Sequence, residues 1–163
     1  MPTMKNINKL ILFFLVLTFT KANAQKTAIY KIDDLTKRIF NNSDTLYVVN
    51  FWATWCKPCV AELPEFEKLH QANIDKKVKV LLVSTDFVEE IDKKLKNFLE
   101  KNKYTCEIVL LDEVNGNDFI NKISEKWSGA IPATLVTKKN KSKNEFHEGK
   151  ITFEMLSKII SDK

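Results

Sequence analysis

The stretch Trp55-Cys56-Lys57-Pro58-Cys59 joins two segments of different character and decides the fold. The residues before it, 46–52, form an apolar run with high β-propensity, whereas residues 60–73 have the pattern of a helix. The cysteine pair therefore lies where a buried strand turns into a helix. Free N–H groups and a partial positive charge at a helix start stabilise a thiolate, the form of cysteine that attacks disulfides.

A Cys-x-x-Cys pair also occurs as half of a zinc site or as a purely structural disulfide. Zinc needs two further ligands, and the chain offers only Cys106, His70 and His147, without ligand spacing between them. A disulfide that closes a four-residue loop constrains the unfolded chain little. We therefore favour a redox pair, with a copper- or zinc-binding module as a less favoured alternative.

Two segments resemble a known family. Residues 51–59, followed by Glu62 and Pro64, resemble the active-site segment of the thioredoxin superfamily, and within it the exported TlpA/ResA-like thiol–disulfide oxidoreductases. Residues 129–134, Gly-Ala-Ile-Pro-Ala-Thr, resemble the family's second signature, a loop that carries a cis-proline. The resemblance implies an α/β, thioredoxin-like fold with a central mixed sheet flanked by helices.

The interval of 73 residues between Cys59 and Pro132 is longer than the resemblance to a minimal thioredoxin would imply. We predict that the excess contains a strand at 107–111 and a helix at about 117–127. The TlpA/ResA-like group has such an inserted β-α unit before the cis-proline loop, and this favours that group. Cys106 precedes the strand and is expected to be a small buried residue.

Apolar periodicity predicts the remaining elements. We expect further strands at 28–32, 46–52, 78–84, 134–137 and 144–147, and helices at 35–40, 60–73, 88–101 and from residue 152 onward. Asp33 and Asp34 are expected to cap the first of these helices. Arg38, the only arginine in the chain, is expected to be a solvated surface charge.

The first 24 residues are predicted to be a signal peptide. Two lysines precede an apolar run at 10–19, and Ala22-Asn23-Ala24 offers the small residues that a signal peptidase recognises. The run is about half of the ~20 apolar residues that a membrane-spanning helix needs. We therefore expect cleavage after Ala24, a thioredoxin-like domain at 25–163, no stable membrane insertion, and a soluble, periplasmic protein.

The charge balance does not indicate a nucleic-acid partner. The 163 residues include 26 basic and 21 acidic side chains, and loss of residues 1–24 removes three lysines and no acid, which leaves a net charge of +2. This balance gives no reason to expect nucleic acid as a partner. An exported protein with three cysteines is also not a small disulfide-stapled scaffold.

Cys56 and Cys59 are the predicted catalytic pair. Cys56, at the helix start, is expected to be the more exposed thiol and to attack a partner's disulfide, and Cys59 then attacks Cys56 and releases the reduced partner. Lys57 adds a positive charge that favours the Cys56 thiolate, and Pro58 stiffens the turn. Trp55, Lys57 and Pro58 are also predicted substrate contacts, and no metal or organic cofactor is expected.

Glu62 is a predicted partner of the second cysteine. Asn50 lies where thioredoxin has a buried aspartate that helps to move the proton of the resolving cysteine, and asparagine cannot do this. Glu62 follows Cys59 by three residues and so lies near the same helix face, where the TlpA/ResA-like group commonly has a glutamate. The alternative is a solvated glutamate on the helix surface.

Ile131 and Pro132 are predicted to complete the site. The resemblance implies that the peptide bond between them is cis, which only an X-Pro bond adopts at low cost. The turn would place Pro132 against the cysteine pair. The edge at Ala130-Ile131 could then pair with the extended backbone of a substrate. Trp127 lies near a position where the family often has an aromatic residue, and it is expected to pack under the loop.

The expected function is thiol–disulfide exchange with protein substrates. The resemblance implies a reductase, in cytochrome c maturation or in general periplasmic thiol reduction, that is re-reduced by a membrane electron carrier. A disulfide oxidase or isomerase of the same fold is the alternative, because Lys57-Pro58 does not decide the direction. A peroxidase is less favoured, because such sites use an arginine near the thiol and Arg38 lies far upstream.

Overall fold

The structure is a computed structural model that describes residues 27–162. The predicted signal peptide lies outside the described residues, so cleavage after Ala24 and a domain start at residue 25 stay predictions. Within residues 27–162, no helix is both long enough and apolar enough to cross a membrane.

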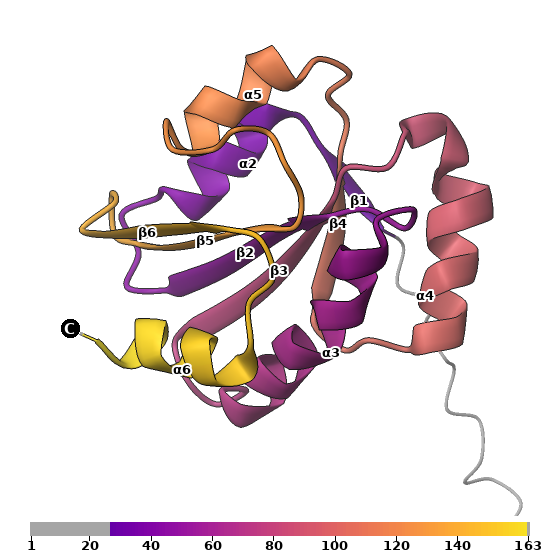
Figure 1. The fold of residues 1–163 in the computed structure, drawn as a ribbon. Coiled ribbons are helices and arrows are strands. Elements are labelled where there is room, and N and C mark those ends of the chain that lie inside the picture. The colour runs from indigo at the N-terminus through magenta and orange to yellow at the C-terminus, as the bar shows by residue number, and fades with distance from the viewer. Residues whose placement is uncertain (1–26, 163) are drawn as a thin grey trace, which may run out of the picture.

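Six strands form one mixed sheet in the order β1-β4-β3-β2-β5-β6 (Figure 1). The first four strands of this order run parallel, whereas β5 is antiparallel to β2 and β6 is antiparallel to β5. Their bounds are β1 Ala28–Tyr30, β2 Leu46–Trp52, β3 Val78–Ser84, β4 Glu107–Leu111, β5 Ala133–Lys138 and β6 Lys143–Glu148. The predicted central mixed sheet is confirmed, and the inserted strand β4 lies between β1 and β3.

Strand β2 is the centre of both halves of the core. All seven of its residues are buried. Because side chains alternate across a strand, Leu46, Val48 and Trp52 belong to one apolar cluster, and Tyr47, Val49 and Phe51 belong to the other. Burial on both faces explains why the sequence of this strand is an apolar run, interrupted only by Asn50, rather than an alternating pattern.

Helices cover both faces of the sheet (Figure 1). Helices α2 (Ile32–Ile39) and α5 (Gly116–Ile123) lie side by side on one face, and α3 (Lys57–Ala72) and α6 (Phe153–Ser161) lie side by side on the other. Cys56 and Cys59 belong to the apolar cluster under α3. Helix α3, which carries Cys59, is therefore supported by the sheet below it and by α6 at its side.

The predicted helix at 88–101 is three shorter elements in the structure. A 3₁₀ turn, η1 (Val88–Glu90), is followed by a π-helical turn, η2 (Ile91–Leu95), and by the α-helix α4 (Lys96–Asn102). The apolar spacing is satisfied by each of these helix types over a single turn. Periodicity alone therefore could not separate them.

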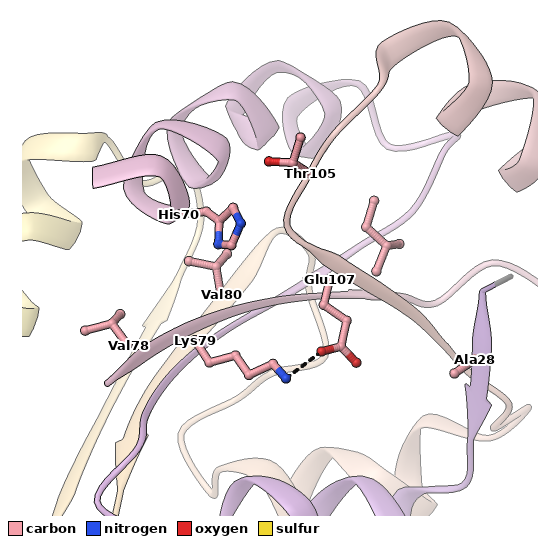
Figure 2. Close-up of a pocket in the computed structure, with 8 residues that line it drawn as sticks. Ala28, His70, Val78, Lys79, Val80, Thr105 and Glu107 are labelled. Atoms are coloured by element: carbon pink, nitrogen blue, oxygen red, sulfur yellow. Dashed lines mark ion pairs between the residues drawn. The ribbon is translucent and has the colours of Figure 1, made fainter. Parts of the chain in front are cut away.

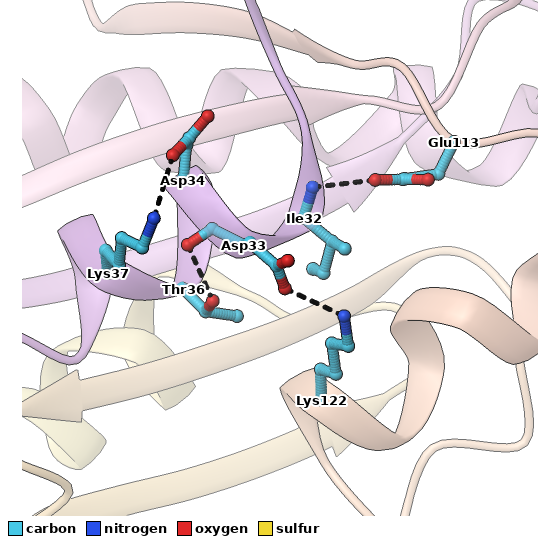
Figure 3. A network of polar contacts seen from close by, with 7 residues as sticks. All are labelled: Ile32, Asp33, Asp34, Thr36, Lys37, Glu113 and Lys122. Atoms are coloured by element: carbon cyan, nitrogen blue, oxygen red, sulfur yellow. Dashed lines mark hydrogen bonds and ion pairs between the residues drawn. The ribbon is translucent and has the colours of Figure 1, made fainter.

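Helix α2 begins at Ile32, three residues before the predicted start, and Asp33 and Asp34 lie in its first turn rather than at its cap. Its first N–H, that of Ile32, donates to the Glu113 carboxylate at 2.8 Å. Lys122 of α5 pairs with Asp33 at 2.7 Å (Figure 3). Groups distant in sequence thus fix this end of the helix, which corrects the predicted capping.

Arg38 is not the solvated surface charge that we predicted. Its guanidinium donates to the two carboxylate oxygens of Glu107 at 2.7 and 2.8 Å, and its side chain is only 17% exposed. Lys79 reaches the same carboxylate at 2.8 Å. Arg38 first, and then Lys79, lower the pKa of Glu107 to about 2. The pair joins α2 to the first residue of β4.

Helix α5 ends at Ile123, before the predicted end near residue 127. Asn115 caps its start, and its side chain accepts the N–H of Asn117 at 3.1 Å. Ser124 has extended backbone angles and ends the helix. Trp127 therefore lies in the loop that follows.

Candidate active site

Cys56 and Cys59 form a disulfide at the start of α3, with their Cα atoms 5.3 Å apart. Cys56 is the residue before the first turn, and its sulfur accepts the N–H of Cys59 at 3.3 Å. Pro58 lies in the first turn, where a missing N–H removes no helical hydrogen bond. Cys56 is 6% exposed and Cys59 is 0% exposed, which agrees with the predicted order of accessibility.

Three of the four predicted substrate contacts are direct neighbours of the cysteines in the chain and are exposed. Trp55 is 61% exposed, an unusual exposure for so large an apolar side chain. Lys57 and Pro58 are exposed as well. The structure therefore brings these residues together beside Cys56, and their role in substrate binding stays a prediction.

The proline loop lies against the disulfide from the neighbouring strand. The Ile131–Pro132 bond is cis, as the resemblance implied. The Cys56 sulfur is 3.8 Å from the carbonyl oxygen of Ile131. This approach follows from the antiparallel pairing of β2 with β5, in which Phe51 is opposite Ala133.

Trp127 packs beneath this loop, as predicted. Its indole N–H donates to the Ala130 carbonyl at 2.8 Å, and its ring centroid is 4.7 Å from that of Phe51. Gly129 has φ of +97°, and a side chain there would meet the tip of Ile120. The positive φ therefore favours glycine at this turn, whereas the flexible end of the Ile120 side chain could move aside.

Strand β6 holds the other side of the loop through contacts that sequence reasoning missed. The Glu148 carboxylate accepts the N–H and the hydroxyl of Ser128, each at 2.8 Å. The N–H of Gly149 donates to the Pro132 carbonyl, also at 2.8 Å. No local pattern in the sequence marks these residues as neighbours of the loop.

Glu62 is buried at 2% exposure, so the solvated alternative is wrong. One of its oxygens accepts the Asn50 amide and the other accepts the N–H of Ile151, both at 2.9 Å. Desolvation raises the pKa of the Glu62 carboxyl above its ordinary value, and the hydrogen bonds from Ile151 and Asn50 oppose this rise. The structure thus brings Asn50 of β2 and Glu62 of α3 together in the core.

Asp86 is a second buried carboxylate near the cysteines, also 2% exposed, and sequence reasoning missed it. It follows β3 by two residues and contacts Thr54, two residues before Cys56. Its position after β3 could have indicated this contact, because the carboxyl ends of the neighbouring parallel strands β2 and β3 lie at the same edge of the sheet.

The third cysteine lies apart from this site. Cys106 is a free, buried thiol just before β4, as expected. Burial first, and the nearby Glu67 next, raise its pKa well above the usual range for a thiol. Cys106 is therefore held as the neutral thiol, which is a poor nucleophile.

A pocket lies at the opposite end of the sheet, where β3 and β4 begin (Figure 2). It is lined by Ala28, His70, Val78, Lys79, Val80, Thr105, Glu107 and Ile108. None of the predicted site residues lines it. Among residues 27–162, no three side chains of His, Cys, Asp or Glu converge as ligands for a metal ion.

Comparison with known proteins agrees with this geometry. The AhpC/TSA family matches residues 16–143. The chain is 26% identical over 133 residues to the thiol-disulfide oxidoreductase ResA of Oceanobacillus iheyensis, with 81% of this chain covered. It is 33% identical over 116 residues to the thioredoxin-like protein YneN of Bacillus subtilis, with 71% covered. In both cases it spans 64% of the relative's length.

Solved structures have the same architecture. The crystal structure of StoA from Bacillus subtilis matches with a TM-score of 0.57 at 24% identity, over 74% of this chain and 85% of that one. At this identity the likeness shows the fold alone, and it confirms the predicted thioredoxin-like fold. Because the family match extends over most of the sequence, the chain belongs to the AhpC/TSA family of thioredoxin-like proteins.

Proposed function

We propose that this protein is an exported thiol–disulfide oxidoreductase that reduces disulfides in other proteins through Cys56 and Cys59. The observation that carries the proposal is the position of the disulfide. Its Cys56 sulfur is at the start of α3, accepts a backbone N–H, and lies 3.8 Å from the cis-proline loop. The name of the relative ResA, a thiol-disulfide oxidoreductase, supports the same reaction.

In the proposed reaction, the reduced protein begins with a thiolate at Cys56. This thiolate attacks one sulfur of a partner's disulfide, a mixed disulfide forms, and the partner's other sulfur leaves as a thiolate that takes up a proton. Cys59 then loses its proton and attacks the Cys56 sulfur, which releases the partner's second thiolate. Two electrons have passed to the partner, and the Cys56–Cys59 disulfide has formed.

Glu62 is proposed to receive the Cys59 proton. The carboxyl is buried three residues after Cys59 on the same helix, and desolvation raises its pKa, so that a proton is held there more readily than on an exposed glutamate. Asn50 orients the carboxyl through the 2.9 Å hydrogen bond. Asn50 is thus a positioning residue in this scheme.

Substrate binding is proposed at the edge of the proline loop. Ala130 and Ile131 precede β5 and could pair with an extended substrate backbone, which gives affinity without dependence on particular side chains. Exposed Trp55, together with Lys57 and Pro58, would contact the substrate on the other side of the disulfide. Each turnover leaves the protein oxidised, so a second dithiol must restore it, and a membrane electron carrier is the proposed donor.

The arrangement of Arg38 favours this reaction over a peroxidase. The chain's single arginine, which a peroxidase would need beside its thiol, is engaged with Glu107 at the start of β4. The cysteines lie after the opposite, carboxyl end of β2. A measurement of hydrogen peroxide consumption by the reduced protein is expected to show no activity above that of free thiols.

The deciding experiment is the reduction potential of the Cys56–Cys59 pair in the chain from residue 25, with reduction of a protein disulfide measured in parallel. A potential near or below about −250 mV would support a reductase, whereas one near about −120 mV would make the protein an oxidant. Cys106→Ala is the matched control, because this buried thiol should leave both values unchanged. Loss of disulfide reduction in that variant would contradict the assignment of the active pair.

A further inference from the structure

Asp86 is a buried carboxylate that the proposed reaction does not use. Of the carboxylates in residues 27–162, only Glu62 and Asp86 are buried, each at 2% exposure. None of the ion pairs within residues 27–162 involves Asp86. A buried charge without a counter-ion is costly unless hydrogen bonds compensate for it, so its partners indicate what it stabilises.

The partners of Asp86 lie directly upstream of the cysteines. The carboxylate accepts the N–H of Thr54 at 3.1 Å and the Thr54 hydroxyl at 2.7 Å. It also accepts the Ser84 hydroxyl at 2.7 Å, and the backbone N–H of Asp86 donates to that hydroxyl at 3.1 Å. Three donors thus converge on one carboxylate, two of them from the residue two positions before Cys56.

Thr85, next to Asp86, forms a second attachment between the segment after β3 and the end of β2. The N–H and the hydroxyl of Thr85 donate to the Trp52 carbonyl at 2.8 and 3.1 Å. The segment after β3 therefore binds a carbonyl at the end of β2 and an N–H two residues further on. Main-chain groups of Trp52 and Thr54 are both held, so the turn that leads to Cys56 has little freedom to move.

This turn sets the position of the Cys56 sulfur. The N–H of Cys56 donates to the Ala53 carbonyl at 3.1 Å, so the backbone of residues 53–56 is one closed turn. At its end, the sulfur must remain 3.3 Å from the N–H of Cys59, the group that stabilises a thiolate there. A shift of the Thr54 backbone would be passed through this turn to the sulfur.

We propose that Asp86 is a positioning residue for the attacking thiol: its carboxylate fixes the Thr54 backbone and thereby holds the Cys56 sulfur at the first N–H groups of α3. The proposal rests on the proposed function in that Cys56 is the attacking thiol. It concerns the reactivity of that thiol rather than the identity of the substrate.

The experiment separates geometry from charge. Asp86→Ala and Asp86→Asn both remove the negative charge, but the asparagine keeps a carbonyl oxygen that can accept from Thr54, and its amide can donate to Ser84. Both reduced variants would be reacted with a small alkylating reagent across a pH series, in chains that lack Cys106. The rate reports the thiolate at Cys56, and the same samples give the reduction potential.

We expect Asp86→Asn to keep the rate within about threefold of the parent, and Asp86→Ala to lose about tenfold, because a misplacement of about 1 Å can cost about a hundredfold and the shift expected here is smaller. Equal rates for the two variants would overturn the proposal, since charge alone would then account for the effect. Thr54→Val, which removes only the 2.7 Å hydroxyl contact, should fall between the parent and Asp86→Ala, and it replaces the alanine variant if that one does not fold.

Glu67→Gln provides a matched control for lost stability. Like Asp86, Glu67 accepts both a main-chain N–H and a hydroxyl, here from Thr105, but it lies further along α3 and joins that helix to the start of β4. The Glu67→Gln variant should be less stable than the parent and should leave the alkylation rate of Cys56 unchanged. The alkylation rate needs no protein substrate, so a failure to reduce protein disulfides would count against the proposed function and not against this role of Asp86.

Discussion

Replacement of Glu62 by alanine and by glutamine should give very different stabilities. Alanine removes the acceptor of the buried Ile151 N–H and one of the three acceptors of the Asn50 amide, both now bound at 2.9 Å, while the Asn50 amide keeps Thr134 at 3.2 Å and Ala133 at 3.4 Å. A buried donor without a partner costs about 1–3 kcal/mol and the truncation also leaves a cavity, so we expect the free energy of unfolding to fall by about 2–4 kcal/mol. This is a large fraction of the total stability of about 5–15 kcal/mol that is typical of single domains.

Glutamine should be tolerated at the same position. Its carbonyl can accept the Ile151 N–H, and its amide can donate to the Asn50 carbonyl oxygen, which has no partner among the described residues in the wild-type protein. The Asn50 side chain has to rotate to allow this, which moves its amide away from Thr134 and Ala133. We therefore expect Glu62→Gln to cost about 1 kcal/mol at neutral pH, less than Glu62→Ala.

Because the Glu62 carboxyl can be protonated or ionised, the stability of the protein should also depend on pH. Because desolvation raises its pKa above 4.5 in the folded protein, the folded state binds this proton more tightly than the unfolded state does. Its stabilising contribution is complete below about pH 4.5 and is lost as pH rises through the folded pKa. Glutamine does not titrate, so the stability of Glu62→Gln relative to wild type should increase as pH rises from about 4.5 to 7.

Urea unfolding of the oxidised proteins, followed by tryptophan fluorescence between about pH 4 and pH 8, measures both effects. Glu100→Gln, an exposed helical glutamate, is the control and should change stability by less than about 0.5 kcal/mol. A wild-type-to-glutamine difference that does not vary with pH would refute the raised pKa of Glu62. An alanine variant as stable as the glutamine variant would refute the importance of the two hydrogen bonds.

Three further changes test other parts of the structure. Glu107→Gln should lower the free energy of unfolding by about 1–2 kcal/mol at neutral pH, between the values for exposed and for buried ion pairs, because the Glu107 side chain is 28% exposed; because the folded pKa of Glu107 is about 2, this difference should vanish as pH falls from 4.5 towards 2, as urea unfolding would show. Trp127→Phe loses the hydrogen bond to Ala130, so stability should fall by about 1 kcal/mol and the KM for a protein disulfide should rise more than kcat falls; an unchanged KM would place the loop outside the substrate contact. Cys59→Ser should accumulate a mixed disulfide with a partner on a non-reducing gel, whereas trapping by Cys56→Ser instead would reverse the assigned roles.

Features that depend on neighbours along the chain could be predicted from the sequence. Strands β2 and β3 have the predicted bounds, because each is a mostly apolar run that ends at polar or small residues. The cysteine pair and the cis-proline loop carry short motifs, so both halves of the candidate site could be located. The position of Glu62 near the helix face of Cys59 was inferred from a spacing of three residues, whereas its burial depends on Asn50 and Ile151.

Features that depend on distant partners were missed or misjudged. Arg38 is a typical surface residue by its helical pattern, and only the fold places Glu107 opposite it, 69 residues later. The contact between Thr54 and Asp86 requires knowing that β2 and β3 are adjacent and parallel. Similarly, the early start of α2 depends on Glu113, 81 residues away. Periodicity reports which face of an element is apolar and carries no information about such pairs.

The pairing of Phe51 with Ala133 has a consequence during biosynthesis. The two cysteines leave the ribosome more than seventy residues before the proline loop does. Until that loop has been synthesised and β5 has joined β2, the carbonyl of Ile131 is not beside Cys56. A nascent chain therefore presents two ordinary thiols without the completed site. The order of synthesis thus delays the appearance of the completed site until β5 has been made.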